Sequence, residues 1–277
     1  MIELSRQIAD TYPGENTFDQ VLQVNGEPFR LFANRRTLRV ELNGKGYFFK
    51  IHMGVGWKEI IKCLLSLRLP VLGAINEWQA IHRLEELGVE TMTIAGFGLR
   101  GWNPANRQSF LITEELDGTV SLEDVCRDWL QNPPPLRLKR ALIKRIAWMA
   151  RRLHENGVNH RDFYLCHFHL NTQSANDYLN DLAEDYNLHL IDLHRTQVRE
   201  VTPGRWRDKD LVGIYFSAMD IGLSRSDLLR FIRHYTEAPL PQELTENRKH
   251  WLRLHTRACR FYEKTHGRKS PLLDLWT

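Results

Sequence analysis

The most regular pattern of hydrophobic and polar positions lies between residues 37 and 51. Polar and apolar residues alternate over 37–42, Asn43-Gly44 follows, and an aromatic run starts at Tyr47. Alternation on either side of Asn-Gly is the strongest short-range signal of a β-hairpin. We therefore predict two strands joined by a tight turn, with Lys50 inside the second strand and next to phenylalanine residues.

The pattern changes to a helical period after this hairpin. Over 57–69 the apolar residues recur every three or four positions, while Lys58, Lys62 and Arg68 occupy the rest of the helix surface. We interpret this segment as a helix that packs its apolar face on the core. The alternative is that this face contacts a membrane surface or an acidic partner.

A second helix is predicted over 75–87. Gly88 follows it in the position that commonly ends a helix, and Glu77 lies in its first turns. Short apolar stretches over 91–95 and 109–113 complete this part of the chain.

The rest of the chain is predicted to be mainly helical. The pattern becomes helical around 113–118, Ser121 starts a capping-box pattern, and an apolar stripe predicts a helix that ends at Asn156-Gly157. The polar, acidic segment 171–187 is interpreted as a surface insertion. Two more helices are expected over 208–219 and 224–235.

This order of elements predicts an α+β fold with two lobes. A small β-rich lobe with one main helix is expected over 1–115, and a larger helical lobe over 116–277. The hinge between them is placed near 114–118.

Composition narrows the class of protein. The chain has 277 residues, of which 42% are hydrophobic and 26% are charged, as in globular rather than disordered proteins. Its net charge of +4 suits an anionic substrate or a membrane surface and does not call for nucleic acid. The four cysteines form no CxxC pair, the chain starts with polar residues, and no apolar run is long enough to span a bilayer. We therefore expect a reducing, cytoplasmic setting.

The strongest candidate chemistry lies at His160-Arg161-Asp162. Thirty residues after Asp162, the apolar run 188–191 ends in Asp192. A His-Arg-Asp loop followed by a strand with a second Asp is typical of a protein-kinase-like centre. Asp162 would orient the attacking hydroxyl, and Asp192 would hold Mg²⁺ through its carboxylate oxygens. The ordinary alternatives are a solvated loop and a strand-terminating Asp.

Two further residues complete the set that phosphoryl transfer requires. Lys50 is placed to bind nucleotide phosphates, and Glu77 is placed to hold the lysine. Glu115, in the predicted hinge, is a further nucleotide-binding candidate. Lys50 alone is equally typical of a solvent-facing strand residue, but its order along the chain with Glu77, Asp162 and Asp192 favours a site.

Other polar residues allow additional interpretations. Cys166, His167 and His169 follow His160 closely, but they lack the paired spacing of a zinc site, so we expect packed or hydrogen-bonded side chains. Four arginines are candidates for binding an anionic substrate: Arg35, Arg36, Arg205 and Arg207. The alternative is that they are solvated surface charges.

Several stretches resemble the lipopolysaccharide core heptose(I) kinases, the WaaP (RfaP) family. The resemblance covers roughly residues 18–240 and is carried by 35–39, 58–62, 69–74, 77–84, 159–162, 191–195 and 205–211. It implies a two-lobed protein-kinase-like fold and transfer of phosphate from ATP, with Mg²⁺, to the first heptose of the lipopolysaccharide inner core.

The resemblance also implies a setting and partners. Because the acceptor is lipid-linked, the resemblance implies that the enzyme acts at the periphery of the inner membrane, on its cytoplasmic face. It also implies association with acyl carrier protein.

The chain departs from the protein-kinase pattern at three places. A Gly-rich loop does not precede Lys50, and Asp192-Leu193-His194 replaces Asp-Phe-Gly. His167 stands where protein kinases have the Asn that holds a second Mg²⁺, and imidazole is a poor Mg²⁺ ligand. His167 is therefore a weak metal candidate beside Asp192.

Two other functions remain open at this point. The first is a small-molecule phosphotransferase of the antibiotic-modifying type. The second is a pseudokinase that serves as a membrane-associated binding module, against which the presence of Lys50, Asp162 and Asp192 argues.

Overall fold

The computed structural model describes residues 1–32, 34–65 and 73–271. The chain divides into two compact units. Unit 1 comprises Met1–Glu86, Thr91–Asp117 and Asp192–Arg195; unit 2 comprises Leu87–Glu90, Gly118–Ile191 and the chain from Thr196 onward. The lobe boundary that we placed at residue 115 stays a prediction.

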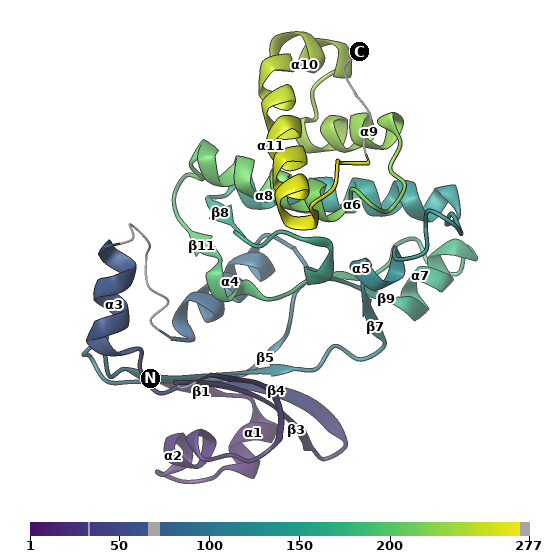
Figure 1. Ribbon diagram of the computed structural model, residues 1–277. Helices are drawn as coiled ribbons and strands as arrows, with labels where there is room; N and C mark the ends of the chain where they lie inside the picture. The colour runs from purple at the N-terminus through teal and green to yellow at the C-terminus, as the bar shows by residue number, and fades with distance from the viewer. Residues whose placement is uncertain (33, 66–72, 272–277) are drawn as a thin grey trace. The chain divides into compact units, whose positions relative to one another are not determined.

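Unit 1 is built on an antiparallel sheet of six strands in the order β1-β5-β6-β4-β3-β2 (Figure 1). Their bounds are β1 Ile2–Leu4, β2 Glu27–Phe32, β3 Arg35–Leu42, β4 Lys45–His52, β5 Ile94–Arg100 and β6 Gln108–Glu114. The predicted hairpin is confirmed: Leu42 pairs with Lys45, and Asn43 and Gly44 form the turn with positive φ angles.

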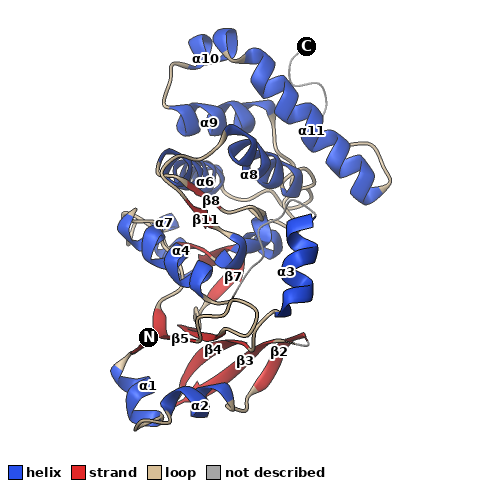
Figure 2. Ribbon diagram, turned by 90° about the vertical axis from the view of Figure 1, so that its left-hand side faces the viewer, coloured by secondary structure: helices blue, strands red, loops and turns tan. Residues whose placement is uncertain are grey.

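The two faces of β4 serve different purposes because side chains alternate along a strand. Phe49 and Ile51 join a buried core with residues of α1 (Arg6–Thr11) and α2 (Thr17–Leu22). These two helices cover that face of the sheet, whereas α4 (Ile75–Glu86) lies on the other (Figures 1 and 2). Lys50 and His52 therefore point to the face that carries α4.

The helix predicted over 57–69 is α3 (Gly56–Leu65), and 66–69 lie outside the described residues. Ile60 is buried, as the core-packing interpretation requires. That interpretation is wrong for the stripe formed by Trp57, Ile61 and Leu65, whose exposed fractions are 54%, 52% and 81%.

Unit 2 is mainly helical (Figure 2). Its helices are α5 Leu122–Val125, α6 Leu136–Glu155, α7 Thr172–Leu179, α8 Gly204–Ser217, α9 Arg225–Thr236, α10 Leu240–Glu246 and α11 Arg248–His266. Short sheets join β7 (Thr119–Ser121), β9 (Phe168–Asn171) and β10 (Leu188–Leu190), and β8 (Val158–Asn159) with β11 (Gln197–Val198). Helices α8, α9 and α11 share a core that includes Trp251 and Tyr262.

Several predicted elements need correction. The region 113–118 is not helical, because β6 runs to Glu114 and a turn leads into β7. The interpretation of 171–187 as an insertion missed α7, and α8 starts before residue 208 because Pro203 already caps it. The amphipathic helix α11 was not predicted. The cap predicted at Ser121 is confirmed, since its side chain accepts a hydrogen bond from the N–H three residues later, and Ser224 caps α9 in the same way.

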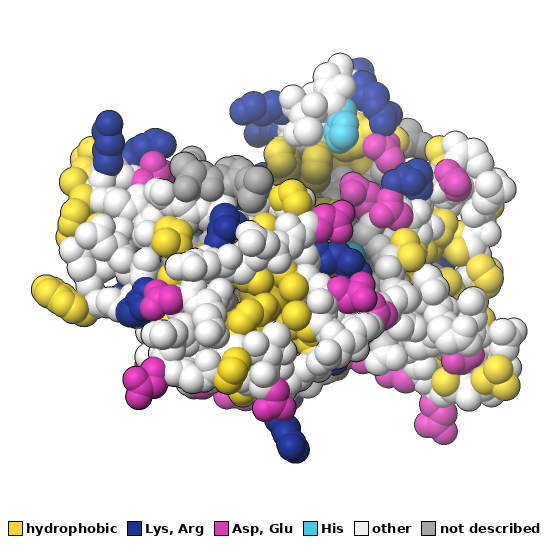
Figure 3. Space-filling model, turned by 90° about the horizontal axis from the view of Figure 1, so that it is seen from below, with side chains coloured by type: hydrophobic (Ala, Val, Ile, Leu, Met, Phe, Trp, Pro, Cys, Tyr) yellow, Lys and Arg dark blue, Asp and Glu magenta, His cyan; other side chains and the backbone are white. Residues whose placement is uncertain are grey.

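On the face drawn in Figure 3, lysine and arginine side chains stand among acidic ones rather than forming a single basic expanse. This distribution agrees with the small net charge of the chain.

Candidate active site

The His160-Arg161-Asp162 loop is held by a carboxylate fifty residues away. Asp210, on α8, has a fully buried side chain. It accepts hydrogen bonds of 2.7 Å from the backbone N–H groups of both His160 and Arg161. Arg161 adopts a φ of 75°, which is unusual for a residue other than glycine. Two charge-assisted bonds to consecutive amides fix this backbone and therefore the direction of Asp162.

Two histidines complete the support of the loop. His160 is buried, and its Nε2 lies 2.9 Å from the carbonyl oxygen of Ile191. Nδ1 of His167 lies 2.6 Å from the carbonyl oxygen of Asp162 and donates to it in the matching tautomer. His167 therefore acts on the loop backbone. Its assignment as a metal ligand stays a weak prediction.

Unit 1 brings Lys50 and Glu77 together. Lys50 Nζ forms an ion pair with Oε1 of Glu77, and the exposed fractions of the two side chains are 12% and 2%. The lysine comes from the centre of β4, and the glutamate comes from the first turn of α4. A lysine fixed in this way presents a positioned cation, which is the geometry needed to bind nucleotide phosphates.

His52 lies on the same face of β4 as Lys50. Burial, followed by the positive charges of Arg35, Lys50 and His194, lowers the pKa of His52 to about 3. The imidazole is therefore neutral at pH 7. These interactions also show that Arg35 and His194 lie in the neighbourhood of Lys50.

Asp192 belongs to unit 1 and follows strand β10 with a φ of 59°. Its Oδ1 lies 2.5 Å from Nδ1 of His194, and Arg30 lies 4.0 Å from its Oδ2. No cluster of three or more potential metal-binding side chains is found in the described ranges. One carboxylate still fits Mg²⁺, which is usually held by one or two carboxylates together with substrate phosphates and water.

The remaining candidates are placed individually. The side chain of Glu115 is occupied by Arg39, which donates to both of its oxygens at 2.9 and 2.7 Å. Arg36 donates to the carbonyl oxygen of Leu22, so it supports α2 rather than sharing the surroundings of Arg35.

Arg205 and Arg207 are also separated. Arg205 lies over the ring of Trp206. Arg207 lies near His250 instead, whose pKa is lowered by burial and, to a smaller extent, by the charges of Arg253 and Arg207. Residues two apart on a helix face different directions, so these neighbours in sequence serve different sites.

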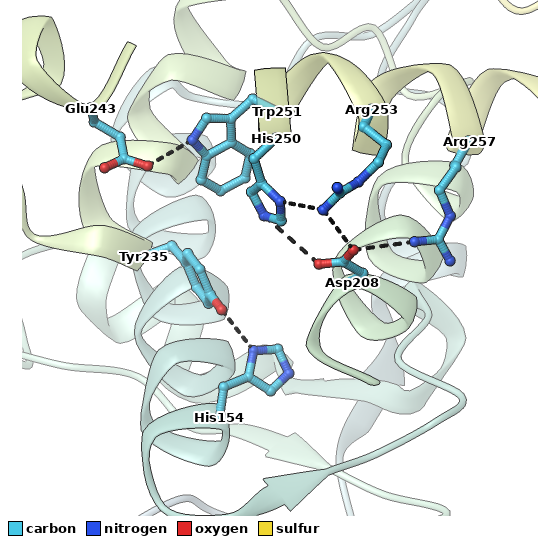
Figure 4. A network of polar contacts seen from close by, with 8 residues as sticks. All are labelled: His154, Asp208, Tyr235, Glu243, His250, Trp251, Arg253 and Arg257. Carbon is cyan, nitrogen blue, oxygen red and sulfur yellow. Dashed lines mark hydrogen bonds and ion pairs between the residues drawn. The ribbon is translucent and has the colours of Figure 1, made fainter. Parts of the chain in front are cut away.

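Sequence reasoning missed the two aspartates of α8. Asp208 contacts three side chains of α11: His250 lies 3.7 Å away, and Arg253 and Arg257 each form an ion pair with it at 3.3 Å (Figure 4). Asp210, two residues later, binds the catalytic loop. The available signal was the pair of carboxylates immediately before the apolar run Leu211-Val212.

The chain is similar to known proteins over most of its length. A profile of the lipopolysaccharide kinase (Kdo/WaaP) family matches residues 19–235. The chain is 51% identical over 245 residues to "Lipopolysaccharide core heptose(I) kinase WaaP" of Escherichia coli (strain K12), covering 88% of this chain and 91% of that protein. It is 50% identical over 251 residues to the protein of the same name from Pseudomonas aeruginosa, covering 91% and 92%.

A solved structure, "WaaP in complex with acyl carrier protein", superposes with a TM-score of 0.81 at 44% identity, covering 95% of this chain and 100% of that one. The predicted α+β, kinase-like fold is thereby confirmed. The chain belongs to the lipopolysaccharide kinase (Kdo/WaaP) family and is an ATP-dependent phosphotransferase.

Proposed function

We propose that the chain phosphorylates the first heptose of the lipopolysaccharide inner core, with Mg²⁺ as the metal. The observation that carries this proposal is that Asp210 and His167 form hydrogen bonds to the backbone of the loop that contains Asp162. The chain is also about half identical in sequence to a heptose(I) kinase.

Each residue has a definite task in the reaction. The heptose hydroxyl attacks the γ-phosphorus in line, its O–P bond forms as the bond to the ADP oxygen breaks, and its proton passes to the carboxylate of Asp162. Lys50, steadied by Glu77, neutralises charge on the phosphates of ATP. Asp192 would hold Mg²⁺, which when bound neutralises charge developing on the phosphate oxygens.

Transfer of label from γ-labelled ATP tests this function. The acceptor is purified core lipopolysaccharide that lacks inner-core phosphate, and wild type is compared with Asp162→Ala. We expect label in the heptose with wild type and a loss of at least about 1000-fold with the variant. Its circular dichroism should stay unchanged. Label on an aminoglycoside and none on the core would contradict the proposal in favour of antibiotic modification.

We further propose acyl carrier protein as a partner. Unit 2 contains an apolar cavity of about 130 Å³, which α5, α6, α8, α9 and α11 line with residues such as Leu142, Ile143, Phe231 and Leu254. Such a lining suits an acyl chain.

Titration of the chain with acylated and unacylated acyl carrier protein tests this partner. We expect tighter binding of the acylated form, and we expect Ile143→Trp, which fills the cavity, to remove the difference. Leu136→Trp is the matched control, because Leu136 is an exposed residue of the same helix that does not line the cavity. Equal binding of both forms by wild type would exclude the cavity as the acyl site.

Peripheral membrane contact is the third part of the proposal. In the described segments of the chain, the helices all fall short of the length and apolar character needed to cross a bilayer. The exposed stripe of Trp57, Ile61 and Leu65 on α3 is flanked by Lys58 and Lys62, as in helices that lie in the interface of an anionic bilayer. Charge reversal at both lysines should weaken binding to anionic liposomes without lowering the melting temperature. If the charge-reversed variant binds anionic liposomes as well as wild type does, the stripe does not contact the membrane and serves another partner.

A further inference from the structure

Three cations surround one indole next to the catalytic loop. The guanidinium carbons of Arg161 and Arg205 lie 5.1 and 5.2 Å from the ring centroid of Trp206, and Nζ of Lys209 lies 5.9 Å from it. Arg205 and Lys209 are one helical turn apart on α8, and Arg161 immediately precedes Asp162. Because all three lie within 6 Å of the same centroid, their charges repel one another.

A fourth cation adds to this repulsion. Burial, followed by the charge of Arg205, lowers the pKa of Arg199. Arg199 donates to the side-chain carbonyl groups of Asn159, at 2.6 Å, and of Gln197, both of which are uncharged. Gly157 permits this close packing, since a Cβ there would lie 1.7 Å from the carbonyl oxygen of Arg199.

The two carboxylates of α8 bind other groups. Asp208 binds α11, and Asp210 binds the amides of His160 and Arg161. Arg205 forms no ion pair with a carboxylate within the described residues, and Nε1 of Trp206 is buried there without a hydrogen-bond acceptor. The first turn of α8 also lacks an acidic residue and a side-chain cap, so its dipole adds positive potential.

We propose that Arg161, Arg199, Arg205 and Lys209 form a subsite around Trp206 for an anionic group of the acceptor, a carboxylate or a phosphate. This inference rests on the proposed function, since it assigns the anion to the acceptor. Arginine suits such a group because its planar fork matches carboxylate and phosphate oxygens. Arg161 immediately precedes Asp162, so an anionic group bound by Arg161 lies close to Asp162. Binding of this group would therefore position the acceptor hydroxyl at Asp162.

Separate variation of ATP and acceptor tests the assignment. We expect Arg205→Gln and Lys209→Gln each to raise KM for core lipopolysaccharide about tenfold while KM for ATP stays unchanged. The acceptor can also be changed, by reduction of its carboxylates or by removal of its phosphates. Whichever treatment removes the group that the subsite binds should make KM for the acceptor equal in wild type and Arg205→Gln. Arg260→Gln is the matched control, since Arg260 is an exposed cation of α11 outside the cluster.

Three results would overturn the subsite. A rise in KM for ATP alone would assign the cluster to nucleotide binding. An unchanged KM for the acceptor would show that the cluster does not bind the acceptor. An equal rise in KM with Arg260→Gln would show that only the overall charge of the protein matters.

A binding measurement separates this inference from the proposed function. With ¹⁵N-labelled indoles, the Trp206 signal, assigned with Trp206→Phe, should shift saturably with inorganic phosphate at constant ionic strength. The shift should disappear in Arg205→Gln. Should wild type transfer no phosphate to core lipopolysaccharide, a saturable shift still supports an anion subsite, whereas its absence overturns it.

Discussion

The two units hold the proposed catalytic groups in different ways. In unit 1, Lys50 and Glu77 meet side chain to side chain, each on a regular element. In unit 2, Asp162 lies on a loop whose backbone is bound by the distant Asp210. A cation on a strand is positioned by one partner. A loop residue with no periodic structure of its own depends on hydrogen bonds to its main chain.

Among the variants that change how these groups are held, the largest effect should come from breaking the pair in unit 1. Lys50→Met should lower kcat/KM for ATP by about 100- to 1000-fold, because a positioned cation on the phosphates is lost. It should also destabilise the fold, because the carboxylate of Glu77 remains buried without its partner. Urea unfolding and steady-state kinetics measure both effects.

The double variant Lys50→Met/Glu77→Gln sharpens this test. Removing both charges should recover most of the lost stability but none of the activity. Recovered turnover would show that the lysine serves the fold alone.

The next effect should come from the loop of unit 2. Asp210→Asn keeps one oxygen acceptor for two backbone amides, so the loop loses a bond and Asp162 moves. We expect kcat to fall about 100-fold. We expect KM for ATP to change little, in contrast to the Lys50 variant. Single-turnover rates at saturating ATP measure this split, and a normal rate would show that the loop keeps its shape without Asp210.

These two variants mark where the sequence pattern indicates a contact and where it does not. Lys50 and Glu77 were found because a hairpin and a helix are periodic and place their residues predictably. Asp210 was missed because its partners are main-chain amides, which leave no residue pattern to read. The members of each arginine pair have different surroundings for a local reason: neighbours on a strand, and residues two apart on a helix, face different directions. Arg35 and Arg36, like Arg205 and Arg207, therefore separate in the structure.

A smaller effect concerns the response of unit 1 to acid. The folded-state pKa of His52, about 3, lies below its ordinary value of 6.5 because of burial and three nearby cations. The unfolded chain thus binds the proton more readily, and stability falls as pH drops below 6.5 toward 3. At pH 5 the loss should be about 2 kcal/mol. Unfolding of His52→Phe should depend less on pH between 7 and 5, and an equal slope would place the acid sensitivity elsewhere.

The smallest effect should come from the other aspartate of α8. Asp208 holds side chains of α11 that are themselves partly exposed, so Asp208→Asn should cost only about 1 kcal/mol, and less at high salt (Figure 4). It should leave kcat unchanged, because its partners His250, Arg253 and Arg257 lie on α11 and not on the loop that carries Asp162. Asp208 and Asp210 stand two residues apart on one helix, so this variant is the natural control for Asp210→Asn. A fall in kcat with Asp208→Asn would mean that α11 also positions the loop, and the contrast between the two carboxylates would be lost.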